Sequence, residues 1–204
     1  MMYLGTQVLT TEPNGTYDTP EQVDRKFVIL DSQTGAIDAD DLAPAPAGTR
    51  SLLWTAFTRA AIFELEAFLG DRRGRTLPFW IPTWQSDLSL ASNLASGAAV
   101  ATIDWVGYTA DHFPNSGARR HLALYADQTI YPHKVSGPAD PGTGITETVT
   151  LSTVAERLFE KDKTLIMFLT LCRLEDDFIE FKWKNSRIAE AIIRFREIPL
   201  EAPL

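Results

Sequence analysis

One segment of the chain has the apolar spacing of an amphipathic helix. Large apolar side chains recur there at intervals of three and four residues, which places them on one helix face. The residues on this face are Ile62, Leu65, Phe68 and Leu69. Thr58 is suited to cap the first turn, and Gly74 can adopt the left-handed conformation that ends a helix. The pattern therefore predicts a helix over residues 58–73.

Most other apolar positions lie in short runs that are typical of β-strands. These runs are 26–30, 51–57, 100–105, 121–126, 129–135, 147–151, 164–174, 178–183 and 188–198. Only Asp127 and Gln128 separate two of them, which indicates a β-hairpin. Many short strands around one helix predict a mainly β protein with one central α-helix, folded as an antiparallel β-sandwich or barrel.

Prolines and small polar residues divide this pattern. Residues 36–49 are acidic and then rich in Pro and Ala, so we expect a loop or arm there. Residues 136–144 hold two prolines and three glycines, so we expect a loop. The resulting division has three parts. Residues 1–50 form an extended N-terminal arm with the first strand, 51–84 and 146–204 form the main β domain, and 85–145 form an inserted β subdomain or a long loop region.

The composition is that of a globular protein with an acidic surface. Hydrophobic residues make up 45% and charged residues 23%, and the formal net charge is −8. No apolar run approaches the length of about 20 residues that a membrane helix needs, so we expect no membrane insertion. An acidic surface repels phosphates, which argues against a broad nucleic-acid interface but suits a wall past which DNA slides.

No familiar catalytic or metal-binding pattern is present in the sequence. His112, His121 and His133 are too scattered for a linear zinc motif, and Cys172 lies in an apolar run where a cysteine usually packs as a small hydrophobe. The acidic runs 38–41 and 175–177 lie in turn-like contexts, and no serine follows the strand–Ser–helix pattern of hydrolases. We therefore expect no cofactor, no metal and no enzymatic activity.

An aromatic cluster follows the predicted helix. Phe79, Trp80 and Trp84 lie in a segment that also contains Pro78 and Pro82, which favours an edge strand or an extended packed segment. Such rings could stack sugars or bases. Bulky rings after an amphipathic helix more often pack in the core or at a subunit interface, and we expect that role here.

Two segments resemble a known family. Residues 63–84, FELEAFLGDRRGRTLPFWIPTW, resemble the distal tail and minor tail proteins of siphophages, in which a similar helix leads through a glycine turn into an aromatic-proline strand. Residues 173–198, which include FIEFKWKNSRIAEAIIRFREI, are similar to the closing strand pair of these proteins. The two segments cover about a quarter of the chain.

The resemblance implies a structural subunit of the phage tail tip, with a β-sandwich or barrel of the tail-tube-like type. It predicts a homo-oligomeric ring, usually a hexamer, that joins the tail tube protein to the baseplate hub protein around a channel through which DNA only passes. The subunit would be assembled in the cytoplasm of the host bacterium and would act in the virion. The candidate structural and interface residues are Ile62, Leu65, Phe68, Leu69, Phe79, Trp80, Trp84 and Phe195.

Two other functions stay open from the sequence. A carbohydrate-binding β-sandwich for host adhesion could use Trp80, Trp84, Trp105 or Tyr108 as a sugar platform. A small hydrolase with catalytic residues dispersed along the chain is also compatible with the sequence.

Overall fold

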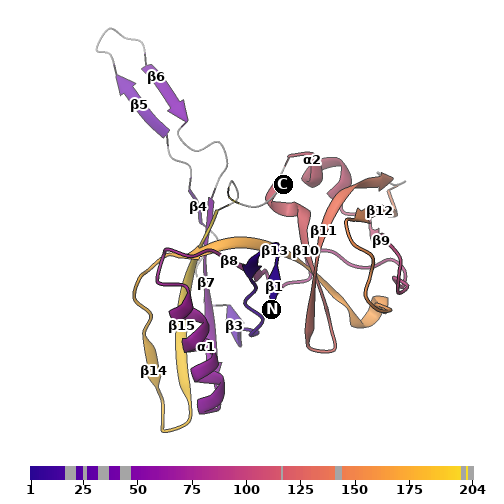
Figure 1. Cartoon of the computed structure of the whole chain (residues 1–204). Helices are drawn as coiled ribbons and strands as arrows, with labels where there is room; N and C mark the ends of the chain where they lie inside the picture. Colours follow the sequence, from indigo (N-terminus) through magenta and orange to yellow (C-terminus); the bar gives the residue numbers. More distant parts are fainter. Residues whose placement is uncertain are drawn as a thin grey trace. The chain divides into compact units, whose positions relative to one another are not determined.

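The computed structural model describes residues 1–16, 22–24, 27–31, 37–41, 47–115, 117–140, 144–198 and 201. The described chain consists mainly of β-strands paired in antiparallel fashion, with one long helix, α1 (Arg59–Asp71), so the predicted fold class is confirmed (Figure 1). Its contacts define two compact units. Unit 1 contains Met1–Glu12 and Phe79–Leu171, and unit 2 contains Pro13–Pro78 and Cys172–Glu201. Residues 85–145, expected as an inserted β subdomain or a long loop region, lie within unit 1.

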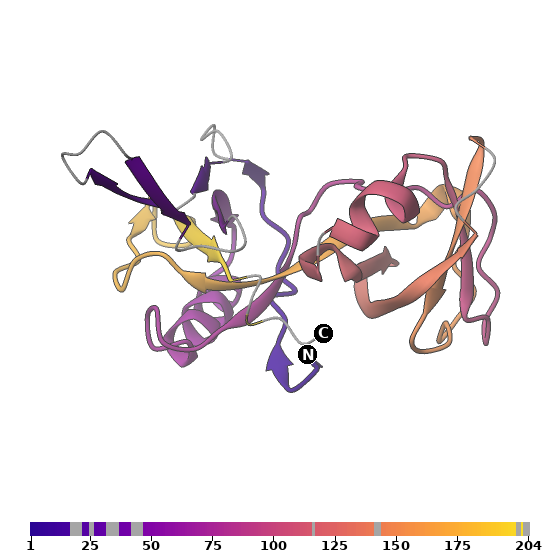
Figure 2. The same cartoon turned by 90° about the horizontal axis from the view of Figure 1, so that it is seen from above.

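Unit 1 is a closed β-barrel. Its strands are β8 (Phe79–Pro82), β9 (Val100–Asp104), β10 (His121–Ala126), β11 (Thr129–Asp140), β12 (Thr146–Leu151) and most of β13 (Leu165–Leu174). They pair in the order β13–β10–β11–β12–β9. The segment after β8 closes the circle, because Leu88 bridges Ile166 of β13 and Leu90 bridges Ile103 of β9 (Figure 2).

Strand alternation fills the barrel. On β9, Ala101 and Ile103 are buried, whereas the flanking Val100 and Asp104 are exposed, as expected for side chains on opposite faces. The buried cluster takes its side chains from all of these strands and from their connections. It comprises Leu88, Leu90, Leu94, Ala101, Ile103, Tyr108, Leu122, Leu124, Ala126, Val135, Val149, Leu151, Ala155, Phe159, Ile166 and Phe168.

Tight turns and short helical segments connect the strands of unit 1. Asp127 and Gln128 both have positive φ angles, 49° and 59°, so the predicted hairpin between β10 and β11 closes through a tight primed turn. Short helical turns join β9 to β10. They are η1 (Tyr108–His112), α2 (Phe113–Asn115) and η2 (Gly117–Arg120), and a further turn, η3 (Lys161–Lys163), precedes β13.

The N-terminal residues belong to unit 1. Strands β1 (Met2–Tyr3) and β2 (Thr6–Gln7) form a small hairpin. The indole Nε1 of Trp80 donates to the carbonyl of Tyr3 at 3.1 Å, and the amide of Leu9 donates to the carbonyl of Trp80 at 2.8 Å. These bonds attach the start of the chain to β8.

Unit 2 is a sheet covered by α1. Its strands are β3 (Gly15–Thr16), β4 (Gln22–Asp24), β7 (Ala47–Ala56), β14 (Phe181–Trp183), β15 (Ala189–Glu197) and the end of β13. β7 and β15 pair along most of their length, from Ala56 opposite Ala189 to Thr49 opposite Arg196. Figure 1 shows α1 running beside these two strands.

The helix has the predicted cap and apolar face. The Oγ1 atom of Thr58 accepts a hydrogen bond from the amide of Ala61 at 3.2 Å, and Ile62, Leu65 and Leu69 are buried. At the other end, Arg73 and Gly74 both have positive φ angles, so the chain leaves the helix through a left-handed turn.

Two loop predictions are wrong in part. Residues 136–144 were expected as a loop, but β11 continues to Asp140 and pairs with β12, with register irregularities between Val135 and Gly137 and between Pro138 and Asp140 that accommodate the proline. In the expected loop 36–49, Ile37–Asp41 forms β6, which pairs with β5 (Phe27–Asp31). Cross-strand pairing offsets the weak strand propensity of both segments. Residues 42–46 lie outside the described part.

Candidate functional site

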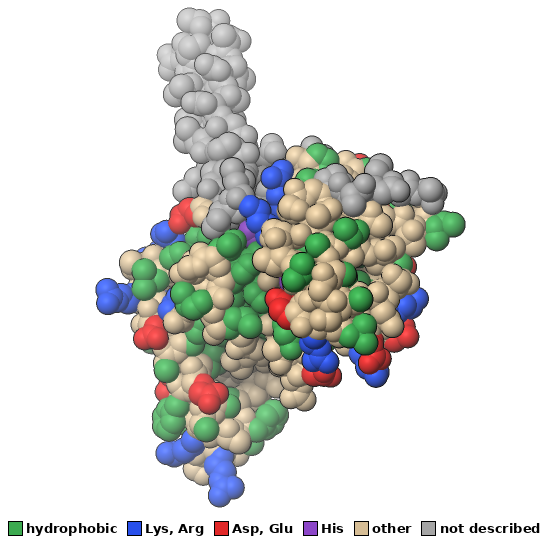
Figure 3. All heavy atoms as spheres, turned by 45° about the vertical axis from the view of Figure 1, so that its right-hand side comes forward, with side chains coloured by type: hydrophobic (Ala, Val, Ile, Leu, Met, Phe, Trp, Pro, Cys, Tyr) green, Lys and Arg blue, Asp and Glu red, His purple; other side chains and the backbone are tan. Residues whose placement is uncertain are grey.

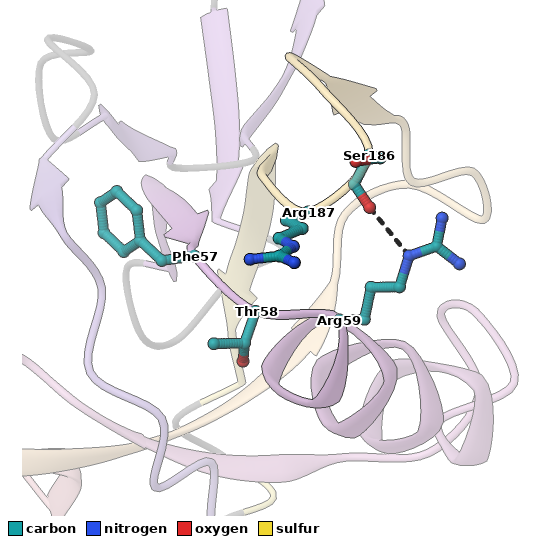
Figure 4. Close-up of a pocket in the computed structure, with 5 residues that line it drawn as sticks. All are labelled: Phe57, Thr58, Arg59, Ser186 and Arg187. Carbon is teal, nitrogen blue, oxygen red and sulfur yellow. Dashed lines mark hydrogen bonds between the residues drawn. The ribbon is translucent and has the colours of Figure 1, made fainter.

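A surface pocket of about 580 Å³ lies at the N-terminal end of α1 in unit 2. It is lined by Phe57, Thr58, Arg59, Ser186 and Arg187 (Figure 4). The register of the sheet creates it. Because Ala56 of β7 pairs with Ala189 of β15, the residues just after β7 lie beside those just before β15.

Local hydrogen bonds order both sides of the pocket. Thr58 is fixed as the N-cap of α1, and the adjoining Arg59 donates from Nε to the carbonyl of Ser186 at 2.8 Å. In the facing loop, Oδ1 of Asn185 accepts hydrogen bonds from the amides of Arg187 at 2.8 Å and Ile188 at 2.9 Å. The pocket is therefore lined by a helix start and a hydrogen-bonded turn.

The chemistry of the pocket suits binding. Arg59 and Arg187 are exposed, and the five lining residues include no His, Cys, Asp or Glu that could move a proton near neutral pH. Phe57 is 63% exposed and supplies an apolar wall. Two guanidinium groups and a phenyl ring can hold an anion that carries an apolar neighbour.

A second polar centre lies in the barrel of unit 1. Glu147 is only 1% exposed, because strand alternation points it inward like Val149. Its carboxylate accepts hydrogen bonds from the amides of Val106, Tyr108 and Thr109 at 3.0, 3.0 and 2.8 Å, and from Oγ1 of Thr109 at 2.6 Å. Burial acts to raise the pKa of Glu147, but these hydrogen bonds outweigh it, so the pKa lies below its ordinary value. Such a carboxylate stays ionised and holds the turn.

One arrangement comes close to a catalytic triad. The Nδ1 atom of His133 lies 3.0 Å from Oγ1 of Thr153, and its Nε2 lies 3.1 Å from a carboxylate oxygen of Glu156. The His133 side chain is completely buried, and that burial lowers its pKa despite the nearby carboxylate. A lowered pKa makes the imidazole a weaker base, so we interpret this chain of contacts as an attachment of the turn after β12 to β11.

The other histidines also have packing or surface positions. His121 is buried, and its Nδ1 lies 2.9 Å from the hydroxyl of Tyr3. His112 is exposed on η1. The described residues contain no group of three or more His, Cys, Asp or Glu that could hold a metal ion. In the same part of the chain, no helix is long and apolar enough to span a membrane.

The structure places five of the eight predicted interface residues in unit 2. Ile62, Leu65 and Leu69 pack inward from α1, and the partly buried ring of Phe68 has the guanidinium carbon of Arg72 5.1 Å from its centroid. Phe195 is 1% exposed. Its ring meets that of Trp54 edge-on, with the centroids 5.7 Å apart.

The aromatic cluster after the helix belongs to unit 1. Phe79 and Trp80 are completely buried. Trp84 is half-buried, has a positive φ angle of 56°, and meets the ring of Tyr125 edge-on at 5.9 Å. Whether Trp84 contributes to a subunit interface stays a prediction.

Burial limits the candidate sugar platform. Trp80 and Tyr108 are both 0% exposed, and the Tyr108 hydroxyl donates to the carbonyl of Arg119 at 2.7 Å. Neither ring can therefore stack a sugar. Trp105 is 49% exposed and adjoins Val106 and Ile145, which are also exposed. Figure 3 shows exposed hydrophobic side chains on one face as separate groups among charged ones.

No protein-family model matches this chain, and a search of curated proteins finds no match.

Sequence reasoning missed the pocket and Glu147 for different reasons. The two sides of the pocket, residues 57–59 and 186–187, are more than 120 positions apart in the sequence. Only the pairing of β7 with β15 brings them together. The burial of Glu147, by contrast, could have been predicted from the sequence. This residue lies two positions before Val149 in an alternating strand, which places its carboxylate on the buried face.

Proposed function

We propose that the protein is a structural subunit of a bacteriophage tail tip, a distal tail or baseplate ring protein. In this role, copies of the chain form a ring, of six members in the related family, between the tail tube and the central hub. The ring leaves a channel through which DNA passes. Its place in the virion is the tail tip.

The observation that carries the proposal is the contact between the two segments that resemble distal tail proteins. Arg75, at the glycine turn after α1, donates hydrogen bonds to Asp177, just after β13. Leu69 and Gly74 from the first segment and Leu174 and Phe181 from the second line one shallow pocket of about 220 Å³. Two stretches separated by about 90 residues therefore make one packed element, as expected if the resemblance reflects a shared fold.

The chemistry of the described sites gives further support. The pocket beside Arg59 has no proton-transferring group, the Glu147 carboxylate is saturated with hydrogen bonds, and His133 is buried. Each of these sites suits packing or recognition rather than bond breaking. A subunit that joins other proteins requires only those properties.

The proposal is tested by removing the gene from the phage genome that encodes the chain and imaging the particles produced. We expect particles that lack a completed tail tip and do not infect, and we expect a plasmid copy of the gene to restore both properties. Infectious virions with normal tails in the absence of the protein would contradict the proposed role.

A further inference from the structure

The pocket beside α1 combines unpaired positive charge with an exposed ring. Within the described residues, the guanidinium group of Arg187 has no hydrogen-bond or ion-pair partner. That of Arg59 donates from Nε to the carbonyl of Ser186, and its central carbon lies 5.7 Å from the centroid of the Trp183 ring. Figure 4 shows Arg187 lying between Phe57 and Arg59. A ligand in this pocket would meet cationic and apolar groups side by side.

This local charge stands out in an acidic chain. The protein has 27 acidic and 19 basic residues. Several other cations of unit 2 have carboxylate partners, including Lys184 with Glu190 at 3.0 Å and Arg173 with Glu201 at 2.6 Å. The two arginines of the pocket have no such partner in the described part of the chain, so both remain available to an external anion.

We propose that this pocket binds an acidic peptide segment of a partner protein, one in which Asp or Glu side chains alternate with apolar ones. The carboxylates pair with Arg59 and Arg187, and the apolar side chain packs on the phenyl ring of Phe57. Exposed ion pairs contribute little individually, so the apolar contact supplies part of the affinity. Binding at the pocket does not depend on whether the protein forms a tail-tip ring.

Size and charge favour this ligand over other anions. A single phosphate would fill only a small part of a pocket of about 580 Å³ and would leave Phe57 uncovered. A nucleic acid would carry many phosphates across a protein whose net charge is −8, and repulsion would oppose that contact. A short acidic peptide presents its charge only at the arginines.

Fluorescence anisotropy with labelled peptides tests the proposal directly. The probes are the blocked peptide GLDFDLG and its neutral counterpart GLNFNLG, in a buffer of about 0.1 M ionic strength, where the Debye length is about 10 Å. We expect the intact protein to bind the acidic peptide. Its affinity for the neutral peptide should be lower by at least about tenfold. Arg187→Glu should reduce binding of the acidic peptide by about tenfold or more, because it replaces attraction with repulsion.

Two further variants separate the pocket from general charge effects. Arg194→Glu makes the same change in net charge at an exposed position on β15 that does not line the pocket, and we expect affinity within about twofold of the original. Phe57→Ser should weaken binding by removing the apolar wall. Thermal unfolding of each variant checks that it is folded.

Four results would overturn the proposal. Three of them are no binding of the acidic peptide, equal binding of the two peptides, and equal losses for Arg187→Glu and Arg194→Glu. Displacement of the acidic peptide by a 15-residue single-stranded oligonucleotide that binds more tightly would also overturn it, in favour of a nucleic-acid site.

Discussion

The guanidinium group of Arg75 and the carboxylate of Asp177 form a two-pronged contact, with Nε and Nη2 at 3.2 and 2.9 Å from Oδ2. The amide of Arg75 also donates to Oδ1 at 3.0 Å. These bonds lower the pKa of Asp177, most of all the side-chain bond from Arg75. The contact connects the end of α1 with the segment between β13 and β14 and so orders both.

Two glycine-to-alanine substitutions near this contact should have opposite effects on the free energy of unfolding. Gly74 has a φ angle of 62°, and an added Cβ would clash with Oδ1 of Asp177 and lie 3.3 Å from its Cα. Gly74→Ala should therefore lower the free energy of unfolding by about 1 to 3 kcal/mol. Gly70→Ala, inside α1 with open space around it, should raise that free energy by about 0.5 to 1 kcal/mol. Chemical denaturation of both variants measures the difference, and equal effects would refute this account of the turn.

Glu147 makes the stability of unit 1 sensitive to acid. Its pKa is lower in the folded chain than its ordinary value of 4.5, so its contribution is complete above about pH 4.5 and is lost as the pH falls through the folded pKa. Glu147→Gln should remove this part of the pH dependence. It should also cost about 2 to 4 kcal/mol at pH 7, because a neutral amide cannot replace all four hydrogen bonds.

Urea denaturation at pH 7 and at pH 3.5 provides the measurement for Glu147. The gap in unfolding free energy between the original protein and Glu147→Gln should narrow at the lower pH. A gap that is constant or wider at low pH would mean that the Glu147 carboxylate is not held ionised by its hydrogen bonds. Thr109→Val is the milder control, since it removes one of the four bonds.

The contact of Thr153 and Glu156 with His133 allows a direct test for hydrolase activity. We expect the purified protein to hydrolyse p-nitrophenyl esters no faster than the Thr153→Val variant, because burial lowers the pKa of the imidazole and weakens it as a general base. The same substitution should lower the free energy of unfolding by about 1 kcal/mol through loss of the bond to Nδ1. Ester turnover that disappears in Thr153→Val without a loss of stability would instead assign these residues to catalysis.

Local signals in the sequence predicted the local elements well. The helix followed from its apolar spacing and from Thr58, and the hairpin followed from the two residues between β10 and β11. Both features depend on contacts within a few positions of the chain, where residue preferences act directly.

Features that depend on contacts between distant residues could not be predicted from the sequence in this way. Leu88 and Leu90 close the barrel through isolated bridges inside a polar stretch, so no run of alternating residues marks them. Likewise, β11 extends through Pro138 because its pairing with β12 tolerates register irregularities, which turn statistics do not reveal. The pocket depends on the register between β7 and β15, and a single sequence does not specify that register.

The central claim is that copies of this chain assemble with tail proteins, and native mass spectrometry tests it most directly. The protein is co-expressed and co-purified with the tail tube and hub proteins encoded in the same genome. We predict a complex in which six copies of the 22.7 kDa chain contribute about 136 kDa together with at least one of these neighbours. A chain that stays monomeric and binds neither neighbour would contradict the claim.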